Sequence, residues 1–215
     1  MIKACIFDLD GVIVDTARYH FLAWSRLATE LNIPFTEQDN ERLKGVSRVE
    51  SLNILLSLGK GLHLDPSERE KLAARKNEWF VEYINHMRRD EIFPGVEHLI
   101  GELKKSGMRI GLASSSKNAP QVIQSLGILE RFDSIVDGSM VTHAKPDPEI
   151  FLLAASRLSV PAANCLVFED AAAGIDAACA AGMKCVGVGS RDQLGRADMV
   201  ISKTGEFTVS MLSQL

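Results

Sequence analysis

The sequence has no long hydrophobic run. Hydrophobic residues make up 46% of the 215 positions, yet no segment approaches the roughly 18 uninterrupted apolar residues that a membrane-spanning helix needs. The first residues also lack the basic stretch, apolar core and small-residue cleavage site of a secretory signal. These absences predict a cytoplasmic protein without a membrane partner, and the hydrophobic content is sufficient for a substantial core.

Excess charge and cysteine pairs are also missing. The formal net charge is −4, and the 24 basic residues are interspersed with 28 acidic ones, so no basic field is available for a nucleic-acid partner. The cysteines lack the C-x-x-C spacing of a zinc site, which favours buried, reduced thiols at Cys5, Cys165, Cys179 and Cys185. A redox or metal role for Cys5 is the less favoured alternative.

Short apolar runs and amphipathic segments predict the fold. β-rich runs occur at 3–8, 108–113, 133–136, 165–169 and 184–188, and from Ser106 onward they alternate with segments of helix length. This alternation is typical of a doubly wound α/β fold with a parallel, Rossmann-like sheet. Between the first two runs only helical periodicity is found, at 17–31, 36–43, 48–58 and 66–88.

A helical subdomain is therefore expected as an insertion after the first strand. We place the α/β core at residues 1–15 and 93–215 and the helical subdomain at 16–92, because Pro94-Gly95 breaks any helix on the return to the core.

Two carboxylates stand at the end of the first predicted strand. Asp8 and Asp10 are followed by Gly11, which allows the backbone to turn sharply. An Asp-rich turn leading into a helix cap is one interpretation. The other is catalytic: Asp8 attacks phosphorus as a nucleophile, and Asp10 is the general acid/base.

Such an attack requires cations, because a carboxylate and a phosphate dianion repel each other. Lys145 follows the third predicted strand, and Glu169-Asp170 end the fourth. With Asp8 and the Asp10 carbonyl, the acidic pair offers the hard oxygen ligands that Mg²⁺ takes. Taken singly, these residues are more often a solvated turn lysine and a helix start. Their coincidence with other strand ends, where ligands bind in open α/β sheets, favours a site.

A polar run follows the second predicted strand. It supplies hydroxyl groups, backbone amides and a helix start that suit phosphate oxygens, and comprises Ser114, Ser115, Ser116, Lys117 and Asn118. A plain N-cap run is an equal alternative for Ser115 and Ser116.

These motifs carry a resemblance to a known family. Asp8-x-Asp10, Ser114, Lys145 before Pro-x-Pro, and Glu169-Asp170 match in order and spacing the four motifs of the haloacid dehalogenase superfamily, and the helical insertion resembles its first type of cap domain. Further matches resemble the β-phosphoglucomutase-like subfamily, namely Phe7 to Thr16, Tyr19-His20, Ala23-Trp24, Leu43 to Arg48, Lys76-Asn77 and Ala113 to Asn118.

The resemblance implies an activity. It implies one Mg²⁺ per subunit, an aspartyl phosphate on Asp8, and interconversion of β-D-glucose 1-phosphate and glucose 6-phosphate. β-Glucose 1,6-bisphosphate would be the intermediate that primes the cycle. Substrate-binding residues implied in the cap are Thr16, His20, Trp24, Lys44, Gly45, Val46, Ser47, Arg48, Ser51 and Lys76. From composition alone, Lys44 to Arg48 is an ordinary turn with a basic rim, His20 and Lys76 are surface residues, and Trp24 is a core residue.

Other functions compete with this interpretation. A capped sugar-phosphate or phosphoglycolate-type phosphatase would use the same core residues and differ in the cap loop. A receiver-like signalling module would be phosphorylated on Asp without turnover, but the helical insertion argues against it. Ala171 departs from the family, where a Ser often follows the acidic pair. We expect a small-molecule sugar phosphate as the only partner and a monomer, although the sequence does not specify the oligomeric state.

Overall fold

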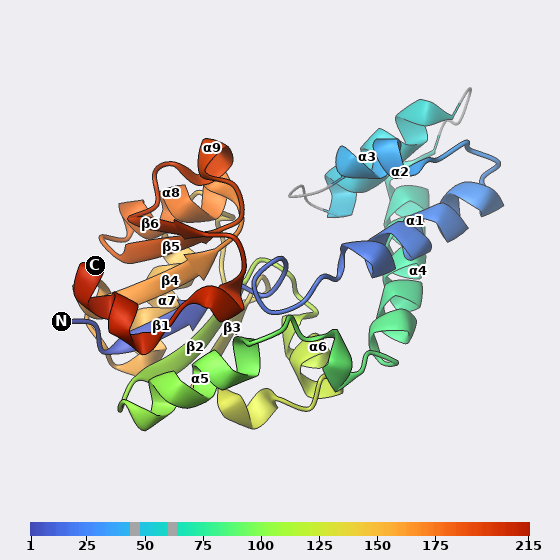
Figure 1. Cartoon of the computed structure of the whole chain (residues 1–215). Helices are drawn as coiled ribbons and strands as arrows, with labels where there is room; N and C mark the ends of the chain where they lie inside the picture. The colour runs from blue at the N-terminus through green and yellow to red at the C-terminus, as the bar shows by residue number, and fades with distance from the viewer. Residues whose placement is uncertain (44–47, 60–63) are drawn as a thin grey trace. The chain divides into compact units, whose positions relative to one another are not determined.

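The computed structural model describes residues 1–43, 48–59 and 64–215 (Figure 1). The chain divides into two compact units. One comprises Met1–Asp15 and Met87–Leu215, and the other comprises Thr16–His86. We call them the sheet unit and the helical unit and describe each by itself.

The sheet unit is built on a six-stranded sheet in the order β3-β2-β1-β4-β5-β6, with every neighbouring pair parallel. The strands are β1 (Ala4–Phe7), β2 (Arg109–Ser114), β3 (Ser134–Asp137), β4 (Cys165–Glu169), β5 (Lys184–Val188) and β6 (Met199–Ile201). Because all strands run the same way, their carboxyl ends share one edge. This edge is where ligands bind in such sheets.

Helices cover the sheet through alternate residues of each strand. On one face, Ile6 and Val167 belong to a fully buried cluster with residues of α7 (Glu149–Leu158) and α8 (Ala172–Ala180). On the other face, Phe7 stacks on Phe168 with 4.6 Å between ring centroids, and Phe168 meets Phe207 edge-on at 5.0 Å. Burial of both faces explains why the strands are continuous apolar runs.

Further helices and 3-10 turns complete the sheet unit. They are η1 (Arg89–Glu91), α5 (Val96–Lys105), α6 (Ala119–Ser125), η2 (Leu129–Arg131), η3 (Ala162–Asn164), α9 (Arg191–Leu194), η4 (Thr204–Glu206) and η5 (Val209–Gln214). Thr204 donates a hydrogen bond from Oγ1 to the carbonyl oxygen of Val12 at 2.7 Å. This buried bond ties the turn that follows β1 to the C-terminal segment.

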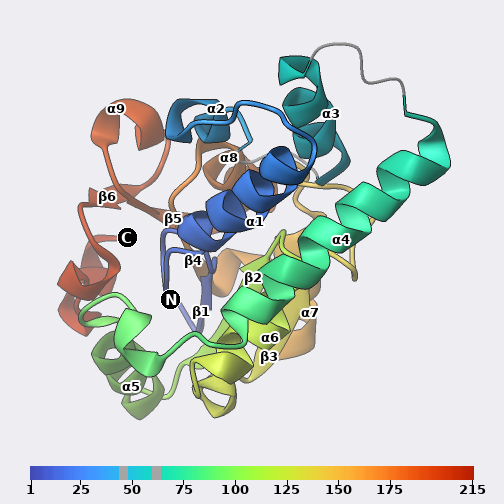
Figure 2. The ribbon, with the colours of Figure 1, turned by 90° about the vertical axis from the view of Figure 1, so that its right-hand side faces the viewer.

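The helical unit contains α1 (Ala17–Glu30), α2 (Glu37–Glu41), α3 (Arg48–Leu58) and α4 (Pro66–Ile84). Figure 2 shows α1 and α4 lying side by side, and these two helices contact each other closely. Capping boxes begin α2, where Thr36 pairs with Asp39, and α4, where Asp65 pairs with Glu68. Pro66 is the first residue of α4. Capping boxes and a proline in the first turn are local sequence features that favour a helix start.

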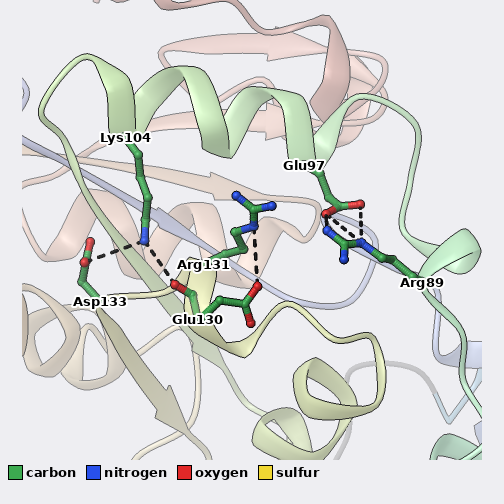
Figure 3. A network of polar contacts seen from close by, with 6 residues as sticks. All are labelled: Arg89, Glu97, Lys104, Glu130, Arg131 and Asp133. Carbon is green, nitrogen blue, oxygen red and sulfur yellow. Dashed lines mark hydrogen bonds and ion pairs between the residues drawn. The ribbon is translucent and has the colours of Figure 1, made fainter.

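The return to the sheet unit lies earlier than the sequence-based boundary. We placed 87–92 with the helical insertion, whereas these residues group with the sheet unit. These residues are attached to the sheet unit by an ion pair. Arg89 of η1 makes a forked ion pair with Glu97 of α5 (Figure 3). In the same network Nζ of Lys104 lies 3.9 Å from Oδ1 of Asp133 and donates a hydrogen bond to the backbone carbonyl of Glu130. Nε of Arg131 lies 3.8 Å from Oε1 of Glu130. These contacts bind η1 and η2 to α5.

The predicted fold class is confirmed by this sheet and its helices. β6 was not predicted, because its three residues are too few to produce an apolar run that stands out. Within the residues that the structure describes, no helix combines the length and the apolar character needed to cross a bilayer.

Candidate active site

The ends of β1, β2 and β4 bring the core motifs together. Phe7 is in register with Leu112 and Phe168 of the neighbouring strands, so the next residue, Asp8, emerges at the shared edge. Its backbone N–H donates to the carbonyl of Phe168 at 2.9 Å. Ser114 and Glu169 are the last residues of β2 and β4. The strand register therefore gathers side chains that are distant in the sequence.

Lys145 joins two of these acids. Its ammonium group lies 2.6 Å from Oδ1 of Asp8 and 2.7 Å from Oε2 of Glu169, and it also donates to the carbonyl of Ala113 at 3.4 Å. The side chains of Lys145 and Asp8 are each 9% exposed, and that of Glu169 is 2% exposed. Burial opposes the charge, but the two carboxylates outweigh it and raise the pKa of Lys145, so the lysine stays charged.

The acids outnumber this cation. Ligand oxygens of Asp8, Glu169 and Asp170 all lie within 4.8 Å of one another. Burial, reinforced by the charge of Asp8, raises the pKa of Glu169 to about 8 and that of Asp170 to about 6, while Lys145 opposes both shifts. Asp8 and Glu169 are buried, whereas Asp170 is exposed, so three carboxylates around one ammonium group leave an excess of negative charge that water only partly screens. A hard divalent cation fits this donor set and would neutralise that excess.

Two glycines give the acids room. A Cβ on Gly11 would lie 1.9 Å from Oδ2 of Asp170, and a Cβ on Gly174 would lie 2.0 Å from Cδ of Glu169. Gly11 also has a φ of 72°, which glycine adopts without strain. Any larger residue at either position would displace a carboxylate.

Asp10 occupies the turn just after Asp8. It forms a bridge with Val14, and the N–H of Gly11 donates to the carbonyl of Val14 at 2.9 Å. The N–H groups of Ile13 and Val14 both bond the carbonyl of Leu9. Backbone hydrogen bonds therefore hold this turn together. The side chain of Asp10 does not belong to the group of ligand oxygens formed by Asp8, Glu169 and Asp170.

The polar run after β2 forms a compact turn. The hydroxyl of Ser114 is buried and accepts the N–H of Ser116 at 3.1 Å, and the hydroxyl of Ser116 accepts the N–H of Asn118 at 3.3 Å. Ser115 and Lys117 are exposed, and α6 begins at Ala119. The Ser114 hydroxyl oxygen accepts the hydrogen bond from Ser116, and its own proton is a separate donor that can point to an anion.

Predicted residues also meet in the helical unit. Nζ of Lys76 lies 2.8 Å from Nδ1 of His20, 4.6 Å from the ring centre of Trp24 and 4.9 Å from that of Phe80. His20 stacks on Phe80 at 4.0 Å. Burial, followed by repulsion from Arg48, lowers the pKa of Lys76 to about 7. Burial and the charge of Lys76 hold the pKa of His20 well below its usual value.

The remaining predicted cap residues are scattered among the elements of this unit. Thr16 is buried ahead of α1, Arg48 begins α3, and Ser51 is buried in α3. Lys44, Gly45, Val46 and Ser47 lie outside the described residues.

Several residues that contact the predicted site residues, or hold the segments that carry them, were not predicted from the sequence. Phe80 is part of the His20 and Lys76 cluster, and its position one helical turn from Lys76 could have indicated it. Asp137, the buried last residue of β3, and Glu149, the first residue of α7, hold the segment that carries Lys145. Their positions at a strand end and a helix start were the available signal.

Comparison with known proteins fits this geometry. Residues 2–182 match the model of a hydrolase family described as haloacid dehalogenase-like hydrolase. The chain belongs to the haloacid dehalogenase-like hydrolase family. It is therefore an enzyme of a family whose named relatives here include a phosphomutase and a phosphatase.

Individual members of the haloacid dehalogenase-like family are similar over most of the chain. A β-phosphoglucomutase from Bacillus subtilis is 46% identical over 213 residues, which cover 99% of this chain and 94% of that one. A phosphorylated carbohydrates phosphatase from Thermotoga maritima is 34% identical and covers 85% of this chain and 82% of the relative. The crystal structure of a β-phosphoglucomutase from Clostridium difficile has a TM-score of 0.90 at 43% identity, over 100% of this chain and 96% of that one.

Proposed function

We propose that this protein is a magnesium-dependent β-phosphoglucomutase, which interconverts β-D-glucose 1-phosphate and glucose 6-phosphate. The observation that carries the choice of a mutase is the 46% identity to a β-phosphoglucomutase over 99% of the chain, because it extends through the helical unit as well as the sheet unit. The core chemistry is supported by the arrangement of Lys145 between Asp8 and Glu169.

Asp8 is the proposed nucleophile. Lys145 engages Oδ1, so Oδ2 is the oxygen proposed to attack phosphorus and form an aspartyl phosphate. Lys145 also places a fixed positive charge beside the group being transferred, where it stabilises developing negative charge. Ser114, with the turn that follows it, is proposed to donate hydrogen bonds to phosphate oxygens.

Asp8, the Asp10 carbonyl, Glu169 and Asp170 are the proposed ligands of one Mg²⁺. When bound, this ion supplies the positive charge that lets a carboxylate approach a phosphate dianion. Gly11 and Gly174 keep the space around Asp170 and Glu169 open.

Asp10 is proposed to move the proton. As a base it would remove the proton from the 6-hydroxyl of β-glucose 1-phosphate, so that this oxygen takes the phosphoryl group from Asp8 and the 1,6-bisphosphate forms. After the intermediate reorients, Asp8 would accept the 1-phosphoryl group while Asp10 returns the proton to the leaving oxygen. The products are glucose 6-phosphate and the phosphorylated enzyme.

The helical unit is proposed to bind the phosphate that is not reacting. Arg48 can bind it through two parallel hydrogen bonds, and the segment 44–47 is proposed to contribute backbone amides. Thr16, His20, Trp24, Ser51 and Lys76 are proposed to line the same substrate site. A mutase must also keep water from the aspartyl phosphate, since water would complete a phosphatase reaction.

The test is a turnover assay that separates the two reactions. Purified protein is supplied with Mg²⁺, β-glucose 1-phosphate and a trace of β-glucose 1,6-bisphosphate, and both glucose 6-phosphate and free phosphate are followed. We expect glucose 6-phosphate to form much faster than free phosphate, and we expect Asp8→Asn to form neither. Rapid release of phosphate without isomerised sugar would instead identify a capped sugar-phosphate phosphatase, as the 34% identical relative from Thermotoga maritima is named.

A further inference from the structure

Lys145 lies in a long connection without helix or strand. The connection runs from Gly138, after β3, to Pro148, before α7. A lysine side chain on such a segment loses considerable conformational freedom when its ammonium group is fixed between two acids. Something must therefore hold the backbone that carries it.

One end of the connection is fixed by Asp137. This buried carboxylate accepts hydrogen bonds from the N–H and the hydroxyl of Ser139, at 2.7 and 2.5 Å through Oδ1. The carbonyl of Asp137 also accepts the N–H of Met140 at 3.0 Å. The chain is thus turned sharply as it leaves β3.

The other end is fixed by Glu149. Its carboxylate accepts the N–H of Thr142 at 3.0 and 3.1 Å through both oxygens, and the N–H of His143 at 2.8 Å through Oε2. Glu149 is the first residue of α7, which packs against β1, β2 and β3. The carboxylate therefore links the backbone two and three residues before Lys145 to a rigid element of the core.

The charge of Glu149 makes these bonds stronger than neutral ones. The N–H groups of Thr142 and His143 lower the pKa of this carboxyl group, so it is ionised at neutral pH. Hydrogen bonds from amides to a carboxylate are roughly twice as strong as those between neutral groups. The imidazole of His143 also lies 3.0 Å from Oε2, but its side chain is 68% exposed and adds little.

We propose that Glu149 is a positioning residue for catalysis, which fixes the backbone at Thr142 and His143 and thereby holds the ammonium group of Lys145 between Asp8 and Glu169. The proposal rests on the proposed function only in assigning Lys145 to phosphoryl transfer. Glu149 does not touch the reacting atoms, so its effect is expected on the rate of the chemical step and not on substrate affinity.

Three variants separate this role from a general structural one. Glu149→Ala removes the acceptors, and Glu149→Gln keeps one carbonyl acceptor while turning an amide N–H₂ toward the second donor. Glu206→Gln is the matched control, because Glu206 also accepts a backbone N–H, from Ser202 at 3.2 Å, in another part of the sheet unit.

The first measurement does not require turnover. In protein labelled with ¹³C at the lysine ε-carbons, the Lys145 signal is assigned by its absence in Lys145→Arg. We expect this signal to move toward the solvent-exposed lysines in Glu149→Ala, less so in Glu149→Gln, and not in Glu206→Gln. An unchanged Lys145 signal in Glu149→Ala, or in Glu149→Gln if the alanine variant does not fold, overturns the proposal.

The second measurement is hydrolysis of acetyl phosphate, which needs the core chemistry but no sugar. We expect kcat to fall about tenfold in Glu149→Ala and less in Glu149→Gln, with KM changed less than twofold and the thermal midpoint close to that of Glu206→Gln. An unchanged kcat, or a loss confined to KM, contradicts the proposal. Failure to form glucose 6-phosphate would overturn the mutase assignment and leave both measurements interpretable.

Discussion

Lys76 donates a hydrogen bond to His20 in the interior of the helical unit, with Nζ 2.8 Å from Nδ1. The imidazole is neutral because its pKa is held well below the usual value, and the rings of Trp24 and Phe80 that face the ammonium group are also uncharged. Arg48 is also positively charged, and it disfavours protonation of both Lys76 and His20. Lys76 is therefore a buried base whose charge is poorly compensated.

This arrangement predicts how stability depends on pH. The pKa of Lys76 falls from 10.5 to about 7 on folding, so between these values the unfolded chain binds more protons than the folded one. The free energy of unfolding should rise as pH increases from about 7 to 10.5, by up to roughly 4 kcal/mol for a shift of this size. Lys76→Met should abolish most of that rise.

The measurement uses urea unfolding at several pH values. Both tryptophans, Trp24 and Trp79, belong to the helical unit, so their fluorescence reports on that unit. Lys71→Met on the exposed side of the same helix is the control and should keep the pH dependence of the parent protein. A Lys76→Met variant with the parent's slope would refute this explanation.

A pair of helical glycines gives a second prediction. Gly174 faces the Glu169 carboxylate at the start of α8, so Gly174→Ala should displace that ligand and raise the Mg²⁺ concentration for half-maximal activity at least tenfold. Gly101 lies within α5, and a Cβ there would meet nothing within 4 Å. Gly101→Ala should stabilise the protein by about 0.5–1 kcal/mol and leave Mg²⁺ activation unchanged. Equal Mg²⁺ responses in the two variants would be inconsistent with the proposed ligand role of Glu169.

Removal of the buried ammonium group gives a third. Lys145→Met leaves Asp8 and Glu169 without the cation that contacts both, so we expect kcat to fall at least ~100-fold and the thermal midpoint to drop. Lys184→Met, which breaks a half-exposed pair with Asp198, should change kcat less than about twofold. Steady-state assays and thermal unfolding of both variants decide the matter. Comparable kcat values would remove Lys145 from the mechanism.

The sequence predicted those features that depend on local pattern. The apolar runs predicted β1 to β5, and the helical periodicity at 36–43 and 66–88 predicted helix starts close to those observed at Glu37 and Pro66. Asp8, Lys145 and Glu169 were expected near one another because parallel strands end at one edge, and the structure brings them together. The family match covers the same residues.

Features that depend on tertiary contacts could not be predicted from the sequence. Residues 87–92 read as helical insertion, yet the Arg89 and Glu97 pair attaches them to the sheet unit. The pKa of Lys76 depends on its burial in the helical unit and on repulsion from Arg48 of α3, which the pattern of its own helix, α4, does not reveal. Glu149 resembles an ordinary acidic residue at a helix start, and only the folded connection shows that it holds Thr142 and His143.

The most direct test of the central claim is chemical identification of the phosphorylated residue. The enzyme is mixed with Mg²⁺ and β-glucose 1,6-bisphosphate, quenched in acid, and reduced with borohydride, which converts an aspartyl phosphate to homoserine. Peptide mass spectrometry should then find homoserine at position 8 in the parent protein and none in Asp8→Asn. Homoserine at another aspartate, or a phosphoryl group on a residue other than Asp8, would contradict the account.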